Sequence, residues 1–146
     1  MILSFNNLEL LDKKIIIVED DLPSIKYYET LLRNSGAEII IFRNGKDFVD
    51  YVTTNDCKLS LVFMDFLIPF VNGIECIRVL RKTRKSTPVI MLTAYFSEQC
   101  KSEAFVAGCD EFVLKPIFPE RFVYLLEKYL KLESVENPIS NKSLPY

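Results

Sequence analysis

Short apolar runs alternate along the chain with longer segments of helical periodicity. The runs are apolar throughout instead of alternating with polar residues, which is typical of parallel strands covered on both faces of a sheet. Five such runs occur: Lys14 to Val18, Glu38 to Phe42, Leu59 to Met64, Pro88 to Leu92 and Glu111 to Leu114. The pattern therefore predicts five parallel strands.

Each run is followed by a segment in which apolar residues recur at the spacing of a helix that packs one face on a sheet. The five predicted helices begin near Asp21, Asn44, Gly73, Ser97 and Pro119. Five strand–helix units are too few for a closed eight-stranded barrel. Right-handed crossovers between parallel strands then favour an open, doubly wound α/β sheet of strand order 2-1-3-4-5.

Length and composition fit a single domain with a sizeable core. The chain has 146 residues, 49% of them hydrophobic, and a net charge of −2, which gives no reason to expect direct nucleic-acid binding. We expect the domain to span residues 13–132. Residues 1–12 are then an N-terminal extension or linker, and residues 133–146, which mix Pro, Ser and Asn without periodicity, are expected to be a flexible tail.

Features that the sequence lacks narrow the class of protein further. No apolar stretch is long enough to cross a bilayer, and the first residues do not resemble a secretory signal, so we expect a cytoplasmic protein without membrane insertion. The chain has no histidine, which excludes a Ser-His or Cys-His nucleophile pair and autophosphorylation on histidine. Its four cysteines form no C-x-x-C pair and are expected to be free and mostly buried.

Charged and polar residues follow the ends of four of the predicted strands. They are Glu19, Asp20 and Asp21 after the first strand, Asp65 after the third, Thr93 and Ala94 after the fourth, and Lys115 after the fifth. The carboxyl ends of parallel strands meet at one edge of such a sheet, so the fold would bring these residues together. Clustered carboxylates repel one another unless a hard cation such as Mg²⁺ shares them. The pattern predicts a metal-assisted phosphoryl site.

Each of these residues also has an ordinary structural interpretation. Asp21 is best explained as the N-cap of the first helix. Thr93 alone would be a common strand-end residue, and Lys115 alone a surface cation. The occurrence of all these groups at successive strand ends favours a site. The basic residues between Arg78 and Lys85 are interpreted as a solvated helix end, whose cations suit the helix dipole, and not as a nucleic-acid surface.

The same segments resemble the receiver, or phosphoacceptor, domain of two-component response regulators. The matching stretches are IIIVEDD (15–21), LVFMDFLIPFVNG (61–73), VIMLTA (89–94) and GCDEFVLKPI (108–117). The resemblance extends from about Lys13 to Leu132 and implies a flavodoxin-like (βα)5 fold. Residues 36–52 and 108–117 look most similar to receivers of hybrid sensor histidine kinases, and a free-standing regulator is the alternative.

The resemblance implies roles for the acidic residues. Asp65 is implied to accept the phosphoryl group and to become an acyl phosphate. Asp20, Asp65 and the backbone carbonyl of Leu67 are implied to bind Mg²⁺, with Glu19 acting through a metal-bound water. An aspartate attacks phosphorus only when charge on the transferring group is neutralised, which Mg²⁺ and a lysine do in phosphoryl transfer generally.

The resemblance also implies how the phosphoryl group is held and detected. Thr93 and the backbone amide of Ala94 would hold phosphoryl oxygens, and Lys115 would pair with the phosphoryl group. Thr93 and Phe112 would form a switch that changes the face made by the fourth helix, the fifth strand and the fifth helix. A cis bond between Lys115 and Pro116 would aim the lysine into the site.

The implied partner is a histidine kinase or a histidine phosphotransfer protein that supplies phosphate from a phosphohistidine. The chain would then be a regulatory domain in a phosphorelay and not an enzyme, and two copies could pair through the switch face. A cofactor binder of the flavodoxin type would need a Ser-, Thr- or Gly-rich loop where this chain has Glu19 to Asp21. A phosphatase of the haloacid dehalogenase type would have a second aspartate at Leu67. A degenerate receiver that serves only protein contacts is the remaining alternative.

Overall fold

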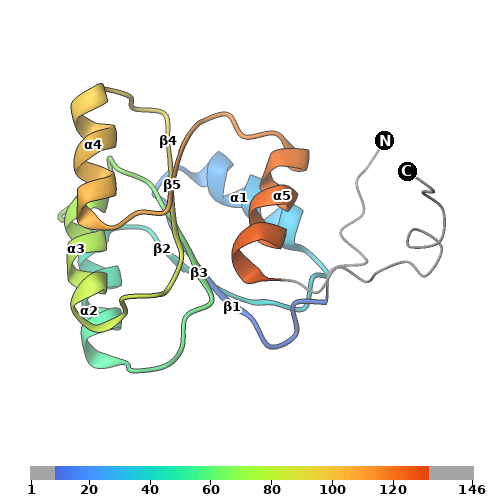
Figure 1. Cartoon of the computed structure of the whole chain (residues 1–146). Helices are drawn as coiled ribbons and strands as arrows, with labels where there is room; N and C mark the ends of the chain where they lie inside the picture. The colour runs from blue at the N-terminus through green and yellow to red at the C-terminus, as the bar shows by residue number, and fades with distance from the viewer. Residues whose placement is uncertain (1–8, 132–146) are drawn as a thin grey trace, which may run out of the picture.

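The apolar runs form one parallel sheet, as the sequence predicts. The computed structural model describes residues 9–131, and its five strands lie in the order β2-β1-β3-β4-β5 (Figure 1). The strands are β1 (Lys14–Val18), β2 (Glu38–Phe42), β3 (Leu61–Met64), β4 (Val89–Thr93) and β5 (Glu111–Leu114). The predicted α/β class and strand order are therefore confirmed.

Three strand boundaries differ from the prediction by one or two residues, among them the end of β4, which lies at Thr93 and not at Leu92. β3 begins at Leu61 and not at Leu59, although Leu59 is buried with an exposed fraction of 2%. Leu59 is buried because it packs into the core just before the strand begins. An apolar sequence pattern does not distinguish such a residue from one that pairs within a strand. β4 begins at Val89 and not at Pro88, since a proline has no N–H for a strand ladder.

Four of the five helices begin at a side-chain cap. The helices are α1 (Leu22–Leu32), α2 (Gly45–Thr54), α3 (Gly73–Thr83), α4 (Glu98–Ala107) and α5 (Pro119–Leu130). The capping side chains accept a hydrogen bond from a backbone N–H of the first turn, and they belong to Asp21, Asn44, Asn72 and Ser97. The predicted capping role of Asp21 is thus confirmed, and Gly108, directly after α4, has the left-handed conformation that often ends a helix.

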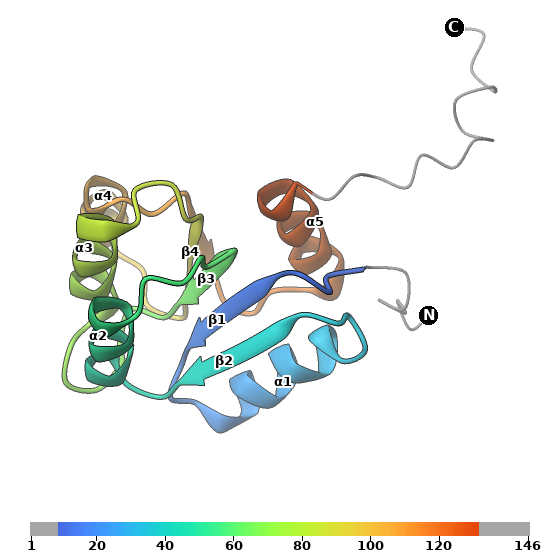
Figure 2. The same ribbon diagram turned by 90° about the horizontal axis from the view of Figure 1, so that it is seen from below.

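The helices cover both faces of the sheet. α1 and α5 lie on one face, and α2, α3 and α4 lie on the other (Figures 1 and 2). Alternate residues of β1 supply the two cores: Ile15 and Ile17 face α1 and α5, whereas Ile16 and Val18 face the other three helices. Helices cover both faces, which explains why the strands are unbroken apolar runs in the sequence.

The packed body begins before the predicted boundary at residue 13. Leu10 is fully buried in the core on the α1 and α5 side, and its N–H donates to the Ser35 carbonyl at 2.9 Å. Leu10, within the expected extension, therefore packs into the core of the domain. The rest of the expected extension and the expected tail, 133–146, lie outside the described residues. Within residues 9–131, no helix has the length and apolar character needed to cross a membrane.

Candidate functional site

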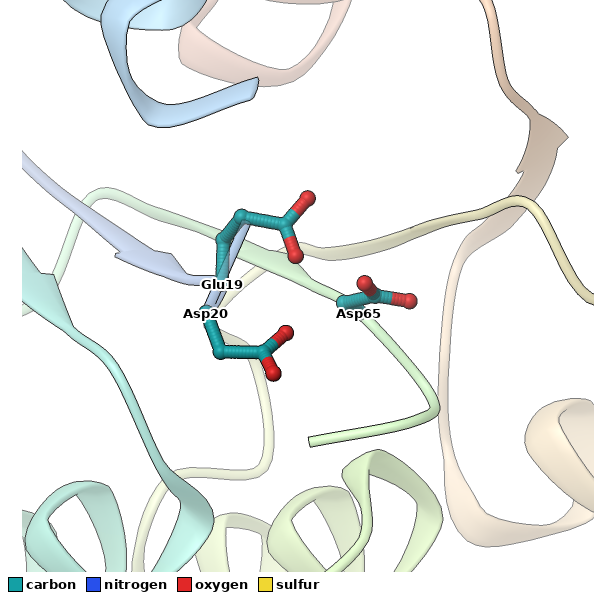
Figure 3. Close-up of side chains that lie close together, drawn as sticks. All are labelled: Glu19, Asp20 and Asp65. Carbon is teal, nitrogen blue, oxygen red and sulfur yellow. The ribbon is translucent and has the colours of Figure 1, made fainter. Parts of the chain in front are cut away.

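Three carboxylates meet at the carboxyl edge of the sheet. The register pairs Val18 of β1 with Met64 of β3, so the residues that follow these strands come side by side. Glu19, Asp20 and Asp65 each place an oxygen within 4.8 Å of the others (Figure 3). The Glu19 side chain is 2% exposed and that of Asp65 is 11% exposed, whereas Asp20 is exposed. The edge therefore forms an acidic pocket that opens to solvent on the Asp20 side.

Lys115 brings one positive charge into this pocket from the end of β5. Its ammonium group forms an ion pair with Glu19 Oε1 and lies 3.3 Å from Asp65 Oδ2. The backbone N–H of Lys115 donates to the Thr93 carbonyl at 2.9 Å, which continues the pairing of β4 with β5. The Lys115–Pro116 peptide bond is cis, as the resemblance to receiver domains implies.

The pKa values of Glu19 and Lys115 are set by their burial and by the charges around them. Burial raises the pKa of Glu19 above its ordinary value, and the Asp65 carboxyl raises it further, while Lys115 acts in the opposite direction. Burial lowers the pKa of Lys115, but the Glu19 and Asp65 carboxylates outweigh it and the pKa is raised overall. Lys115 is therefore held as a cation between two carboxylates.

The donor set fits a divalent cation. Glu19 Oε2 is buried and has no hydrogen-bond partner, and a buried carboxylate oxygen without a partner is costly. Three carboxyl groups surround a single ammonium group. Oxygen ligands from carboxylates are those that Mg²⁺ prefers, so the pocket has both the charge and the ligand chemistry for this ion.

Thr93 is the last residue of β4, the strand that pairs with β3 and β5. Thr93 is buried, and its hydroxyl oxygen accepts the Tyr95 N–H at 3.2 Å, which leaves the hydroxyl hydrogen to be donated elsewhere. Ala94 follows it and is exposed. Phe112 lies on the adjacent strand as expected, although the register pairs it with Met91 and pairs Leu114 with Thr93. The Phe112 ring packs edge-on against Phe96 with ring centroids 6.2 Å apart.

The loop after Asp65 joins β3 to α3 and carries Leu67. The Phe66 N–H donates to Asp65 Oδ1 at 2.7 Å, while Asp65 Oδ2 faces the Lys115 ammonium group. The Phe66 ring lies against Tyr95, with centroids 5.4 Å apart. The structure thus brings Glu19, Asp20, Asp65 and Lys115 together with Thr93 nearby, while their chemical roles remain predictions.

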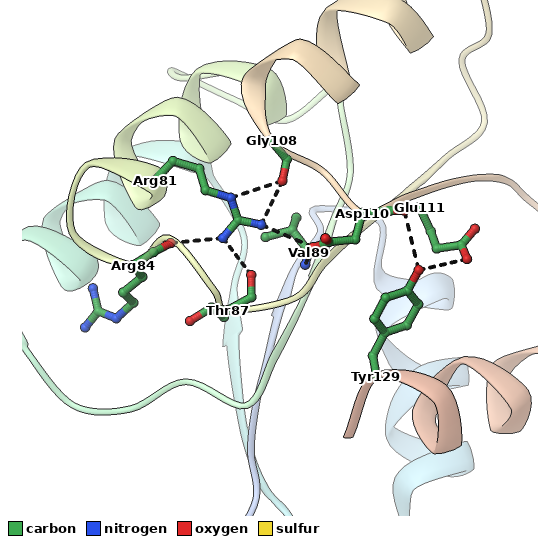
Figure 4. Close-up of polar contacts among 8 residues, drawn as sticks. All are labelled: Arg81, Arg84, Thr87, Val89, Gly108, Asp110, Glu111 and Tyr129. Carbon is green, nitrogen blue, oxygen red and sulfur yellow. Dashed lines mark hydrogen bonds and ion pairs between the residues drawn. The ribbon is translucent and has the colours of Figure 1, made fainter. Parts of the chain in front are cut away.

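Two arginines of the basic run at the end of α3 have a role that the sequence analysis missed. Arg81 uses its N–H groups to bind the carbonyls of Arg84, Thr87 and Gly108 and the carboxylate of Asp110 (Figure 4). The prediction of a solvated helix end is wrong here, because the guanidinium groups satisfy backbone carbonyls that would otherwise be left without donors. The neighbouring Lys82 and Lys85 are exposed, as predicted.

Arg84 acts in the same way on the other side of α3. Its guanidinium donates to the Val52 carbonyl at 2.9 Å and to the Cys57 carbonyl at 3.1 Å, and it also contacts the Asn55 carbonyl. These carbonyls belong to the end of α2 and the segment that follows it. In the sequence, the only local sign of this role is a basic residue just after a helix. Such a residue can either bind the carbonyls of a neighbouring helix or extend into solvent, and the local sequence does not distinguish the two.

Comparisons with known proteins agree with this arrangement. The family model of the response regulator receiver domain matches residues 15–127, more than half of the chain. The polar-differentiation response regulator DivK of Brucella anthropi is 31% identical over 120 residues, which are 81% of this chain and 96% of DivK. The hybrid signal transduction histidine kinase M of Dictyostelium discoideum is 31% identical over 119 residues, which are 78% of this chain and 5% of that kinase.

A solved structure gives the same result for the fold. The BeF3-activated receiver domain of DrrB superposes with a TM-score of 0.72 at 29% sequence identity, over 82% of this chain and 97% of that domain. The strand order, the acidic pocket at the strand ends and the match over residues 15–127 lead to one conclusion. The chain belongs to the receiver domain family of two-component response regulators.

Proposed function

We propose that Asp65 accepts a phosphoryl group from a phosphohistidine of a partner protein in a Mg²⁺-dependent reaction. The observation that carries the proposal is the convergence of three carboxylates and Lys115 in one pocket. Glu19 Oε2 is buried without a hydrogen-bond partner, which lowers the stability of the fold. In a receiver that serves only protein contacts, this loss of stability would bring no functional benefit. This oxygen favours a phosphoacceptor over a degenerate receiver.

In the proposed reaction, an oxygen of the Asp65 carboxylate attacks the phosphorus atom of the donor. The new O–P bond forms as the P–N bond of the phosphohistidine breaks, and the electron pair of that bond stays on the imidazole, which takes up a proton. Lys115 balances charge on the transferred group from 3.3 Å away from Asp65 Oδ2. The Thr93 hydroxyl and the Ala94 N–H donate to phosphoryl oxygens.

The acidic pocket would hold the metal through this chain's own oxygen atoms. Asp20, Asp65 and the backbone carbonyl of Leu67 are the proposed ligands, and Glu19 acts through a bound water. When bound, Mg²⁺ neutralises negative charge on the transferring phosphoryl group. The three carboxyl groups around the single Lys115 ammonium group support a divalent ion at this place.

The partners follow from the same proposal. Residues 1–146 contain no histidine, and we propose that a histidine kinase or a histidine phosphotransfer protein supplies the phosphohistidine. We place the protein in the cytoplasm, where reducing conditions suit its four free cysteines. A hollow of about 320 Å³ on the switch face is lined by residues that include Phe96, Phe112 and Phe118, and it supports pairing of two copies there.

Incubation with acetyl phosphate and Mg²⁺, followed by mass spectrometric mapping, tests the proposal directly. Phosphate on Asp65 is the expected result. A chain that stays unmodified and also fails to bind beryllium fluoride would instead be a degenerate receiver, whose role is confined to protein contacts.

Mg²⁺ is expected to stabilise the fold, because it binds the native pocket and not the unfolded chain. At about one hundred times the dissociation constant, the free energy of unfolding should rise by roughly 2.7 kcal/mol. Asp20→Asn should remove most of this gain. The matched control is Asp56→Asn. Asp56 is exposed and lies between α2 and β3, near the amino ends of the strands. Thermal unfolding with and without Mg²⁺ measures the effect, and a melting temperature that does not depend on Mg²⁺ would contradict the metal assignment.

Phe112→Ala is expected to separate phosphorylation from its detection. Thr93 moves when it donates to a phosphoryl oxygen, and the Phe112 ring can then turn into the space it leaves, which alters the surface of α4 and β5. In the variant, Asp65 should still be phosphorylated, while the changes in α4 amide chemical shifts on adding beryllium fluoride should shrink. Phe105→Ala, on the outer side of α4, is the control. In the unaltered protein, beryllium fluoride could change the amide chemical shifts near Asp65 but not those of α4 and β5. That result would show that Phe112 does not couple the phosphorylation site to this face.

A further inference from the structure

The loop that carries Leu67 is held in place by α2, a helix that contributes no residue to the acidic pocket. The N–H of Gly45, the first residue of α2, donates to the Pro69 carbonyl at 3.0 Å. The same carbonyl also accepts the N–H of Val71 at 2.9 Å. Pro69 is thus fixed both from within the loop and from the neighbouring helix.

Gly45 is required because a side chain at this position would clash with neighbouring atoms, and not because of its backbone conformation. The residue lies at the start of α2 behind the Asn44 cap and does not have a positive φ. A Cβ atom at this position would overlap the Val71 carbonyl oxygen and would lie 2.9 Å from Cys76 Sγ. Helix propensity would favour almost any other residue, so the glycine is explained by the close approach of the loop.

Cys76 of α3 completes this contact. Burial raises the pKa of its thiol to about 12, so the sulfur keeps its proton at neutral pH. The sulfur lies 3.7 Å from the Gly45 carbonyl and 3.8 Å from the Val71 carbonyl, within reach of weak S–H hydrogen bonds. One thiol therefore contacts both the helix and the loop.

The loop conformation shows that these contacts impose a shape on it. Phe70 has φ of 71° between Pro69 and Val71, whose backbone hydrogen bond closes a tight three-residue turn. Such turns with positive φ are rare and strained for a bulky residue. The Phe70 side chain is 82% exposed, so its own packing does not provide compensation. The strain must be offset by the contacts of Pro69 and Val71 with α2 and α3.

Leu67 lies between two fixed points of the same loop. On one side, the Phe66 carbonyl accepts the N–H of Gly73 at 2.9 Å and that of Ile68 at 3.2 Å. On the other side, Pro69 is bound to Gly45. Because peptide units are planar and stiff, a shift of Pro69 changes the direction of the backbone at Leu67, only two residues away.

We propose that Gly45 is a positioning residue for the metal site: by letting α2 touch Pro69 and Val71, it sets the place of the Leu67 carbonyl. This inference rests on the proposed function, in which that carbonyl binds Mg²⁺. It assigns part of the metal affinity to a residue that does not itself contact the ion. Partners that orient metal ligands in this way commonly change metal affinity by tenfold or more.

The loop, and not the helix, should give way when Gly45 is enlarged. α2 is anchored in the core through Phe48 and Val52, which are 0% and 2% exposed. The outer side of the loop is open to solvent at Leu67 and Phe70. A methyl group on Gly45 will therefore push Pro69 and Val71 outward and move Leu67 with them.

Gly45→Ala is the direct test, with Mg²⁺ affinity measured by isothermal titration calorimetry on the full chain. The dissociation constant for Mg²⁺ is expected to rise about tenfold. In the metal-free protein, the amide chemical shifts of Leu67 and Phe70 should also change. The matched control is Gly108→Ala, where a Cβ would lie 2.8 Å from Arg81 Nε at a φ of 119°. This variant should lose stability but should keep the Mg²⁺ affinity of the unaltered protein.

Cys76→Ala provides a second test that adds no atoms, in case Gly45→Ala does not fold. Removing the thiol contacts should weaken Mg²⁺ binding by about threefold, whereas Cys109→Ala, another buried thiol at the end of α4, should not. Unchanged Mg²⁺ affinity in both Gly45→Ala and Cys76→Ala, or an equal loss in their controls, would overturn the positioning role. If the unaltered chain binds no Mg²⁺, the proposed function itself fails and the inference fails with it.

Discussion

Replacing Asp65 by asparagine is expected to abolish phosphorylation of the chain by acetyl phosphate. The substitution keeps the size of the side chain but removes the negative charge and the nucleophilic oxygen. It also removes one of the carboxylates that make the pocket acidic. Mass spectrometry should find a single phosphoryl group on the unaltered protein and none on the variant. Beryllium fluoride binding, followed by amide chemical shifts, should be lost in parallel.

Asp21→Asn is the matched control for this substitution. Asp21 lies only two residues after Glu19, yet its carboxylate accepts the Ser24 N–H at 3.1 Å and the Ser24 hydroxyl at 2.7 Å. Asparagine caps a helix as well as aspartate does, so this variant should be phosphorylated like the unaltered protein. Phosphate on another residue, or an undiminished signal in Asp65→Asn, would show that the acceptor has been misassigned.

Arg81→Ala is expected to lower the free energy of unfolding by about 3 kcal/mol. The side chain is 17% exposed, and its N–H groups are bonded to three backbone carbonyls and to Asp110. Removing it leaves those acceptors without donors in a largely buried place, and each loss costs about 1–3 kcal/mol before relaxation and water entry. Urea unfolding followed by circular dichroism measures the change.

Two further variants locate the cause of this effect. Lys82→Ala, at the adjacent exposed position, should change stability by no more than about 0.5 kcal/mol. Arg81→Lys keeps the charge but cannot bond several carbonyls with one planar group, so it should recover only part of the loss. A loss below about 1 kcal/mol in Arg81→Ala would mean that water replaces the guanidinium, and the arginine would then be a surface residue, as its sequence context indicates.

Much of the fold could be predicted because its signals are local or follow from strand geometry. Unbroken apolar runs arise when a strand is covered on both faces, and the caps at Asp21, Asn44 and Ser97 satisfy N–H groups only two or three residues away. Once the strand order follows from right-handed crossovers, the residues after each strand must meet at one edge. This is why the sequence alone predicts that Glu19, Asp20, Asp65 and Lys115 lie together.

Chemical roles within the site depended on a different kind of information. The clustering of carboxylates predicts a cation site, but it does not say which aspartate is the acceptor. That assignment came from the resemblance of residues 61–73 and 108–117 to receiver domains, and the family match supports the class of protein. The roles of Asp65, Thr93 and Lys115 stay predictions until phosphate has been mapped.

The sequence by itself determined the strands, the caps and the edge where the acidic residues meet, because neighbours and strand ends decide these features. Only the tertiary structure decided the partners of Leu10, Gly45 and Arg81. Arg81 binds the Gly108 carbonyl 27 residues away, and Gly45 makes room for the loop that joins β3 to α3. A basic side chain binds water or a carbonyl, and a position requires glycine or not, according to which backbone segment from elsewhere in the chain lies beside it. No local sequence pattern contains that information.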